Sequence, residues 1–260
     1  MIDNRPIAFF DSGVGGLTVF AKVKKLLPNE NYLYFGDTKN MPYGEKSEKQ
    51  LIEFADRIFK FFEKQNAKAV VMACNTTSAI TYEKLKDNYN FKIYPIIQTV
   101  CSTLAGLDGV KSLGVIATPA TINSHAYSKG IAKYNKDMKV YELAAPNWVR
   151  IVEEHRIHQP QSIEQIKEIL EVMKENNPDK IVLACTHYPY LLDVLKKFLP
   201  EDKYIDPAIF FAQSIKNDLE KNNLLGKEPT YERFYVSSDP ENFKIASELF
   251  YKLDILPELV

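Results

Sequence analysis

Short runs of hydrophobic residues alternate along the chain with longer segments in which hydrophobic residues recur every three or four positions. The short runs have the length of buried strands, and the longer segments have the period of amphipathic helices. We therefore expect strands at residues 7–10, 32–35, 69–73, 93–97, 113–117, 181–184 and 234–236. We expect helices between them at residues 17–27, 47–66, 77–88, 122–134, 162–176 and 190–198.

This alternation is typical of parallel strands joined by crossover helices, so it predicts an α/β fold. A last helix is expected near the C-terminus, where Asp239 can cap the first turn and Pro240 suits the first helical position. Its buried face would carry Phe243, Ala246, Leu249 and Leu253. No low-complexity or Gly/Ser-rich segment marks a domain boundary.

An internal repeat indicates the domain organisation instead. The segment AKAVVMACNTTSA around Cys74 is similar to DKIVLACTHYPY around Cys185, because in each an apolar strand is followed by Ala-Cys and small polar residues. Asp11 and Ser12 end a strand upstream of the first cysteine, and Thr118 ends one upstream of the second at a similar distance. We therefore predict two pseudo-symmetric halves with mostly parallel sheets flanked by helices. Their strands would bring the two cysteines together in the cleft between them.

Composition and charge exclude several functions. The chain of 260 residues is 45% hydrophobic, which is enough for a substantial core. It has 33 Lys and Arg against 34 Asp and Glu, and this balance does not favour a nucleic acid as partner. No apolar stretch has the length of a membrane span, and the first residues lack the pattern of a signal peptide, so we expect a cytoplasmic protein without membrane contact.

The three cysteines, Cys74, Cys101 and Cys185, are odd in number and widely spaced, which argues against a disulfide framework and against a C-x-x-C metal or redox motif. We therefore expect no metal site. Cys101 has no counterpart in the repeat, and we expect it to be structural.

The two repeated thiols suggest a chemistry of their own. A thiolate is a base, so a thiolate and a thiol on opposite faces of a carbon acid could remove a proton from one side and return one to the other. This exchange inverts a stereocentre. Both cysteines lie at expected strand-to-helix turns, and a helix N-terminus is expected to lower their pKa.

Each of these thiols has a candidate partner for proton transfer. His187 follows Cys185 by two residues, and Asp11 ends a strand in the same half as Cys74. The alternative for Asp11 is a cap on the following helix. The remaining histidines are expected to be structural or on the surface: His125, His155 and His158.

The run D-S-G-V-G-G after the first strand could hold an anion with its backbone N–H groups. It is not a dinucleotide fingerprint, because Thr18 stands where the third glycine would be, and the chain has no G-K-[ST] phosphate loop. We therefore expect no nucleotide cofactor.

The segments FFDSGVGGLTV, YFGDTKNMPYG, ACNTTSA and ACTHYP resemble the signature segments of glutamate racemases in order and spacing, and TPATINSHAY and IVEEH are weaker matches. The resemblance covers most of the chain. It implies an enzyme without cofactor that interconverts L-glutamate and D-glutamate and supplies D-glutamate for peptidoglycan. It also implies two bases, with Cys74 acting on D-glutamate and Cys185 on L-glutamate.

The same resemblance implies further site residues. Asp11 would assist Cys74, and His187 would assist Cys185. The substrate would be held by Ser12, Tyr43, Gly44, Asn75, Thr76 and Thr186, with Thr118, Thr121 and Glu153 as secondary candidates. The family fold implies one α/β domain from residues 1–97 and 210–260 and a second from 98–209, and members are commonly homodimers.

Two departures and two alternatives remain open. Gln98, Thr99 and Val100 stand where the family commonly has Glu-Pro-Gly, and Ala184 stands where it usually has Gly. The first alternative is a related enzyme of the same superfamily, acting on aspartate, a hydantoin or maleate, or a decarboxylase. The second is an amino-acid-binding protein without catalysis, which would not need paired cysteines.

Overall fold

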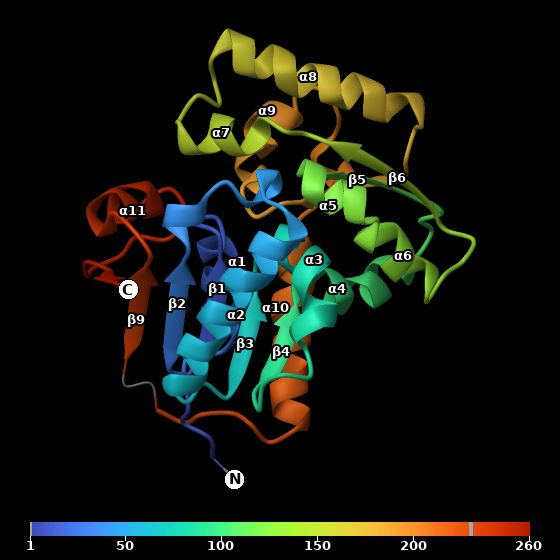
Figure 1. The fold of residues 1–260 in the computed structure, drawn as a ribbon. Helices are drawn as coiled ribbons and strands as arrows, with labels where there is room; N and C mark the ends of the chain where they lie inside the picture. The colour runs from blue at the N-terminus through green and yellow to red at the C-terminus, as the bar shows by residue number, and fades with distance from the viewer. Residues whose placement is uncertain (1, 229–230) are drawn as a thin grey trace.

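The computed structural model describes residues 2–228 and 231–260, which form two β-sheets with helices packed on their faces (Figure 1). The first sheet has the order β10-β9-β2-β1-β3-β4 and the second the order β6-β5-β7-β8. Every strand pair in these residues is parallel. The strands of the first sheet are β1 (Ile7–Asp11), β2 (Tyr32–Gly36), β3 (Ala69–Met72), β4 (Lys92–Pro95), β9 (Glu232–Val236) and β10 (Glu258–Leu259). Those of the second are β5 (Ser112–Ala117), β6 (Lys139–Ala144), β7 (Lys180–Ala184) and β8 (Tyr204–Ile205).

Helices connect these parallel strands, as crossover topology requires. Among the described residues, none of them is long and apolar enough to cross a membrane. The helices are α1 (Leu17–Leu26), α2 (Glu48–Lys64), α3 (Asn75–Leu85), α4 (Ile96–Ala105), α5 (Pro119–Ser124), α6 (Ala126–Ala132), α7 (Trp148–Glu153), α8 (Pro160–Glu175), α9 (Leu192–Leu195), α10 (Pro207–Lys221) and α11 (Pro240–Ser247).

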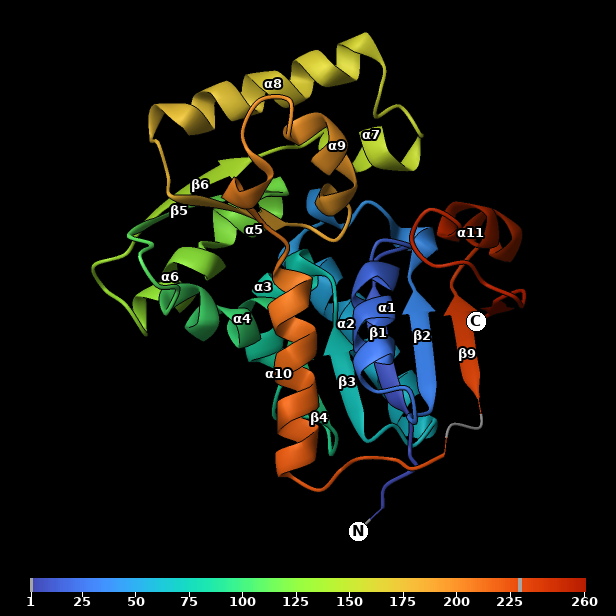
Figure 2. The same ribbon diagram turned by 180° about the vertical axis from the view of Figure 1, so that it is seen from behind.

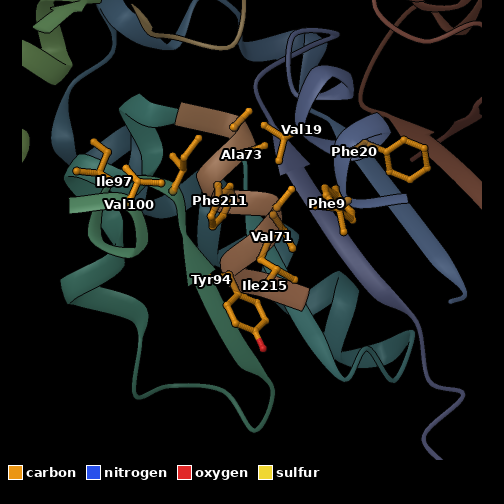
Figure 3. Close-up of a cluster of buried hydrophobic side chains, with 14 of the residues drawn as sticks. Phe9, Val19, Phe20, Val71, Ala73, Tyr94, Ile97, Val100, Phe211 and Ile215 are labelled. Carbon is orange, nitrogen blue, oxygen red and sulfur yellow. The ribbon is translucent and has the colours of Figure 1, made fainter. Parts of the chain in front are cut away.

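Side-chain alternation along the strands divides the core of the first sheet between its two faces. Ile7 and Phe9 of β1 belong to one buried cluster, and Ala8 and Phe10 belong to another, because successive strand residues point to opposite faces. Figure 1 shows α2 over one face, and Figure 2 shows α1 and α10 over the other. On that second face, Phe211 of α10 lies among side chains of the sheet, α1 and α4 (Figure 3). Helix α10 therefore returns the chain from the second sheet to the first.

The sequence pattern predicted most of these elements correctly. Each expected strand is present, and the α/β class is confirmed. The expected strand at 93–97 is wrong at its end, because β4 stops at Pro95 and α4 begins at Ile96. Ile96 and Ile97 are buried in the first turn of α4, as residues of a central strand would be, so their hydrophobicity did not mark the boundary.

Three expected helices also differ from prediction. The helix expected at 122–134 is divided into α5 and α6 by His125, which has a φ of 55°. The segment expected to be helical at 190–198 contains a 3₁₀ turn and the short α9. Asp239 does cap α11 by accepting a hydrogen bond from the Asn242 N–H, but the helix ends at Ser247 and leaves Leu249 and Leu253 outside it.

Other elements were not predicted at all. They are the helices α4, α7 and α10 and the strands β6, β8 and β10. Strands β8 and β10 are two residues long, and β6 is only partly buried, so none of the three has the continuous apolar run of a central strand.

A buried ion pair joins four segments of the chain at the amino ends of the first sheet's strands. Lys68 and Glu30 have almost no exposed surface, and the Lys68 Nζ lies 2.5 Å from a carboxylate oxygen of Glu30. The same ammonium group donates hydrogen bonds to the carbonyls of Asp3 and Leu224. Because all its protons have partners, the charge is satisfied without water.

Replacing Lys68 with alanine should leave the Glu30 carboxylate buried and unpaired, and should lower the free energy of unfolding by about 3–5 kcal/mol. Urea denaturation measures this loss. Lys60→Ala is the matched control, because its ion pair with Asp56 lies largely in water and its removal should change stability little. Equal losses in the two variants would contradict the role given to Lys68.

Candidate active site

A cavity lies where the carboxyl ends of the two sheets meet, and its wall comes from both of them. Strand ends of this kind form the ligand sites of open α/β sheets. The structure brings most of the residues predicted from the sequence to this wall: Ser12, Tyr43, Gly44, Cys74, Asn75, Thr76, Thr118, Glu153, Cys185, Thr186 and His187. Asp11 and Thr121 lie behind it rather than on it.

Cys74 follows β3 and is the N-cap residue of α3, so the strand-to-helix turn places its thiol on the cavity wall. Burial, together with the nearby Asp11 carboxylate, raises the pKa of this thiol to about 12. The expectation that the helix N-terminus lowers this pKa is therefore wrong for Cys74. The loss of water on burial outweighs the effect of the helix, and the Cys74 thiol is protonated at neutral pH.

Asp11, the last residue of β1, is completely buried behind Cys74. Its Oδ1 accepts a hydrogen bond from the Gly13 N–H at 3.0 Å, and its Oδ2 has no partner among the described residues. Burial raises its pKa to about 6, against the opposing effect of His187. The Asp11 carboxyl group thus accepts from the Gly13 N–H in the glycine-rich turn before α1. It is not a cap of this helix, because no side chain caps α1 by a hydrogen bond.

Cys185 has different surroundings. It follows β7, and its Sγ lies 3.8 Å from the His187 Nδ1, while the Nε2 of the same ring lies 2.8 Å from a Glu153 oxygen. Burial disfavours the charged ring, but the contacts with Cys185 and Glu153 outweigh burial and raise the pKa of His187 to about 10. Phe250 packs edge-on against the imidazole at 5.5 Å. His187 is therefore a fixed cation beside this thiol at neutral pH.

Three threonine hydroxyls connect the two halves of the cavity. The Oγ1 of Thr76 on α3 lies 2.9 Å from that of Thr118, at the end of β5. Thr121 completes the cluster from α5, at 3.0 Å from Thr118 and 3.4 Å from Thr76. Thr121 lies behind the cavity wall, and its contacts with both Thr76 and Thr118 keep these two wall residues in place.

Tyr43 lines the cavity with its hydroxyl already committed. That hydroxyl donates to the Asp37 Oδ2 at 2.5 Å, and Asp37 also pairs with the Arg57 guanidinium at 2.9 Å. Asp37 has no exposed surface, so it anchors the loop that carries Tyr43 and Gly44. A side chain at position 44 would come within 3.3 Å of Thr118, so glycine permits the close approach of this loop to the second sheet.

Several site residues were missed by the sequence analysis. Arg150 and Glu45 line the cavity and form an ion pair at 2.8 Å between α7 and the loop after β2. Tyr127 of α6 donates a hydrogen bond to Asn75. These contacts join residues far apart in the chain, so no local spacing marked them.

Gln98, which stands where the family commonly has Glu, makes two hydrogen bonds with Ser78. Gln98 lies in the first turn of α4, where its Oε1 accepts from the Ser78 hydroxyl at 2.8 Å and its Nε2 donates to the Ser78 carbonyl. Ser78 in turn donates its N–H to the Cys74 carbonyl. Gln98 therefore secures the first turn of the helix that begins beside Cys74.

In the described part of the chain, no cluster of three or more His, Cys, Asp and Glu side chains could hold a metal ion. The titratable groups of the cavity form two sets instead. One pairs Cys74 with the buried carboxyl of Asp11, and the other pairs Cys185 with His187 and Glu153. Each set contains a thiol and a group able to exchange a proton with it.

Two parallel sheets and two thiols lining one cavity define an α/β protein with a candidate small-ligand site at the carboxyl ends of its strands. Residues 16–215 match the family model described as Asp/Glu/Hydantoin racemase. The chain belongs to this racemase family.

Individual relatives are similar over nearly the whole chain. A glutamate racemase of Thermoanaerobacter pseudethanolicus is 39% identical over 95% of this chain and 94% of its own length. One of Carboxydothermus hydrogenoformans is 37% identical over 95% and 93%. The crystal structure of glutamate racemase from Francisella tularensis in complex with D-glutamate superposes with a TM-score of 0.91, at 36% identity, over 100% of this chain and 98% of that one.

Replacing Glu153 with glutamine should lower the pKa of His187 below its value of about 10, because the ring keeps its contact with Cys185 but loses the carboxylate at its Nε2. The ring of the variant would then lose its proton at a lower pH than in the wild type. An NMR titration of the imidazole, assigned by comparison with His187→Asn, measures the change. If both proteins titrate at the same pH, Glu153 is not what holds the proton.

Proposed function

We propose that this chain is a glutamate racemase, which interconverts L-glutamate and D-glutamate by two-base proton transfer without a cofactor. The observation that carries the proposal is the presence of Cys74 and Cys185 on one cavity wall, each at the end of a strand of a different sheet. The relatives named glutamate racemase and the structural neighbour with D-glutamate support the choice of substrate.

In this proposal, the cysteine thiolate on one side takes the α-proton, and the electron pair of the broken C–H bond stays on the α-carbon. The thiol on the opposite side gives its own proton to that carbon and becomes the thiolate. Cys74 acts on D-glutamate with help from Asp11, and Cys185 acts on L-glutamate with help from His187. The imidazolium of His187 stabilises a neighbouring thiolate, and the raised pKa of Asp11, about 6, suits an acid that exchanges protons.

Hydrogen-bond donors around the cavity are suited to a dicarboxylate. The Asn75 Nδ2 has no partner among the described residues although Asn75 is 4% exposed, so a bound carboxylate oxygen can accept from it. The other proposed substrate ligands are Ser12, Tyr43, Gly44, Thr76 and Thr186, with Thr118 and Glu153 as supporting residues on the wall and Thr121 behind it. Because the Tyr43 hydroxyl donates to Asp37, Tyr43 would bind the substrate through its backbone N–H. Held in one orientation, the substrate keeps its α-carbon between the thiols.

Purified protein in D₂O, with no cofactor added, should introduce deuterium at the α-position of L-glutamate while the circular dichroism of the sample decays to zero. Proton NMR of the α-hydrogen follows the exchange. If aspartate, a hydantoin or maleate reacts and glutamate does not, the function is that of a related enzyme. Binding of glutamate without exchange would favour the amino-acid-binding alternative.

The cysteine variants provide the mechanistic control for this assay. Cys74→Ser and Cys185→Ser should each lower racemisation by roughly 10²–10⁴, because a hydroxyl is a far weaker acid–base group. Cys101→Ser makes the same chemical change at a thiol buried outside the cavity and should keep activity. Full activity in either of the first two variants would exclude the two-base mechanism.

Three further properties are proposed on the resemblance to glutamate racemases. They are a homodimeric assembly, a cytoplasmic role in supplying D-glutamate to peptidoglycan, and a division into residues 1–97 with 210–260 and residues 98–209.

Expression of this chain should restore the growth of a bacterium that requires D-glutamate. Sedimentation velocity of the purified protein should give twice the chain mass. Failure of growth with active protein, or a monomer at micromolar concentration, would contradict the corresponding property.

A further inference from the structure

The oxygen and the nitrogen of the Asn75 side-chain amide have different surroundings. Its Oδ1 accepts a hydrogen bond from the Tyr127 hydroxyl at 2.7 Å, whereas its Nδ2 has no partner among the described residues. Asn75 lines the cavity as the first residue of α3, directly after Cys74. An unpaired buried N–H₂ group costs free energy unless a ligand accepts from it.

The amide of an asparagine can turn over and exchange its oxygen and nitrogen at little cost unless a neighbour discriminates between them. With the oxygen facing the cavity, an acceptor would meet an anionic ligand and repel it. Binding of a carboxylate therefore depends on a donor that holds the oxygen on the far side.

Tyr127 is suited to that task. Its side chain is 1% exposed and comes from α6, next to the second sheet, so its hydroxyl reaches α3 across the boundary between the two sheets. Burial raises the pKa of this phenol well above its ordinary value, which keeps the donated proton on the oxygen. A tyrosine hydroxyl can also accept from an amide N–H. However, the Asn75 Oδ1 is the acceptor that the Tyr127 O–H has among the hydrogen bonds of the described residues, so a turned amide would leave that buried proton unpaired.

We infer that Tyr127 is a positioning residue for substrate binding, which fixes the Asn75 amide with its N–H₂ group toward a substrate carboxylate. This inference deepens the proposed function and rests on it for the identity of the substrate. Tyr127 lies outside the cavity wall, so it acts through Asn75. Because the amide contacts the substrate before and during proton transfer, its orientation governs binding more than turnover.

Tyr127→Phe removes one oxygen atom and keeps the buried ring. It should raise both the KM and the dissociation constant for glutamate roughly three- to tenfold, with kcat changed by less than about twofold. Steady-state kinetics gives KM and kcat, and calorimetry with D-glutamate gives the dissociation constant. Tyr32→Phe is the matched control, because that buried hydroxyl donates to the Leu27 carbonyl away from the cavity. It should leave all three values unchanged.

A double-mutant cycle tests whether Tyr127 acts through Asn75. In an Asn75→Ala background, Tyr127→Phe should have no further effect on KM or on the dissociation constant, because the amide it positions is absent. An equal increase in both backgrounds, or no increase in the wild-type background, would overturn the inference while leaving racemisation by the wild-type protein intact. A wild-type protein that neither binds glutamate nor exchanges its α-hydrogen would instead overturn the proposed function and the substrate assignment with it.

Discussion

Parallel pairing of the strands is the constraint on which the arrangement of this molecule depends. Because neighbouring strands run in the same direction, all of their carboxyl ends reach one edge of each sheet, and Asp11, Cys74, Thr118 and Cys185 lie at or just after such ends. Helices α4 and α10, which run between the two sheets, bring these edges together. A single cavity thereby collects side chains that are distant in the sequence.

Exclusion of water gives this cavity its chemical character. The same burial raises the pKa of Asp11 to about 6 and of Cys74 to about 12, while His187 stays protonated because Glu153 and Cys185 surround it. Local helix geometry alone suggests the opposite direction for Cys74, since helix N-termini favour thiolates. A buried site is therefore governed by which charges remain close together after water has left.

The sequence predicted what depends on local pattern. Apolar runs marked the central strands, and repeated Ala-Cys turns marked the two thiols, because both features are written in consecutive residues. The boundary at Pro95 was misplaced because a buried strand and a buried helix N-terminus are equally hydrophobic. The local pattern did not mark Tyr127, Arg150 and Glu45, because their partners are distant in the chain. It did not mark Asp37 either, because only the fold shows that this residue is completely buried.

The unequal surroundings of the two thiols have a thermodynamic consequence for a racemase. The enantiomers of an amino acid have the same free energy in water, and both directions pass through the same transition states, so kcat/KM must be identical for the two. The two thiols have different neighbours, Asp11 beside Cys74 and the His187–Glu153 pair beside Cys185. This difference cannot favour one enantiomer at equilibrium. The asymmetry can only decide which enantiomer is held more tightly and released more slowly, so it sets the resting occupancy of the cavity in a racemic pool.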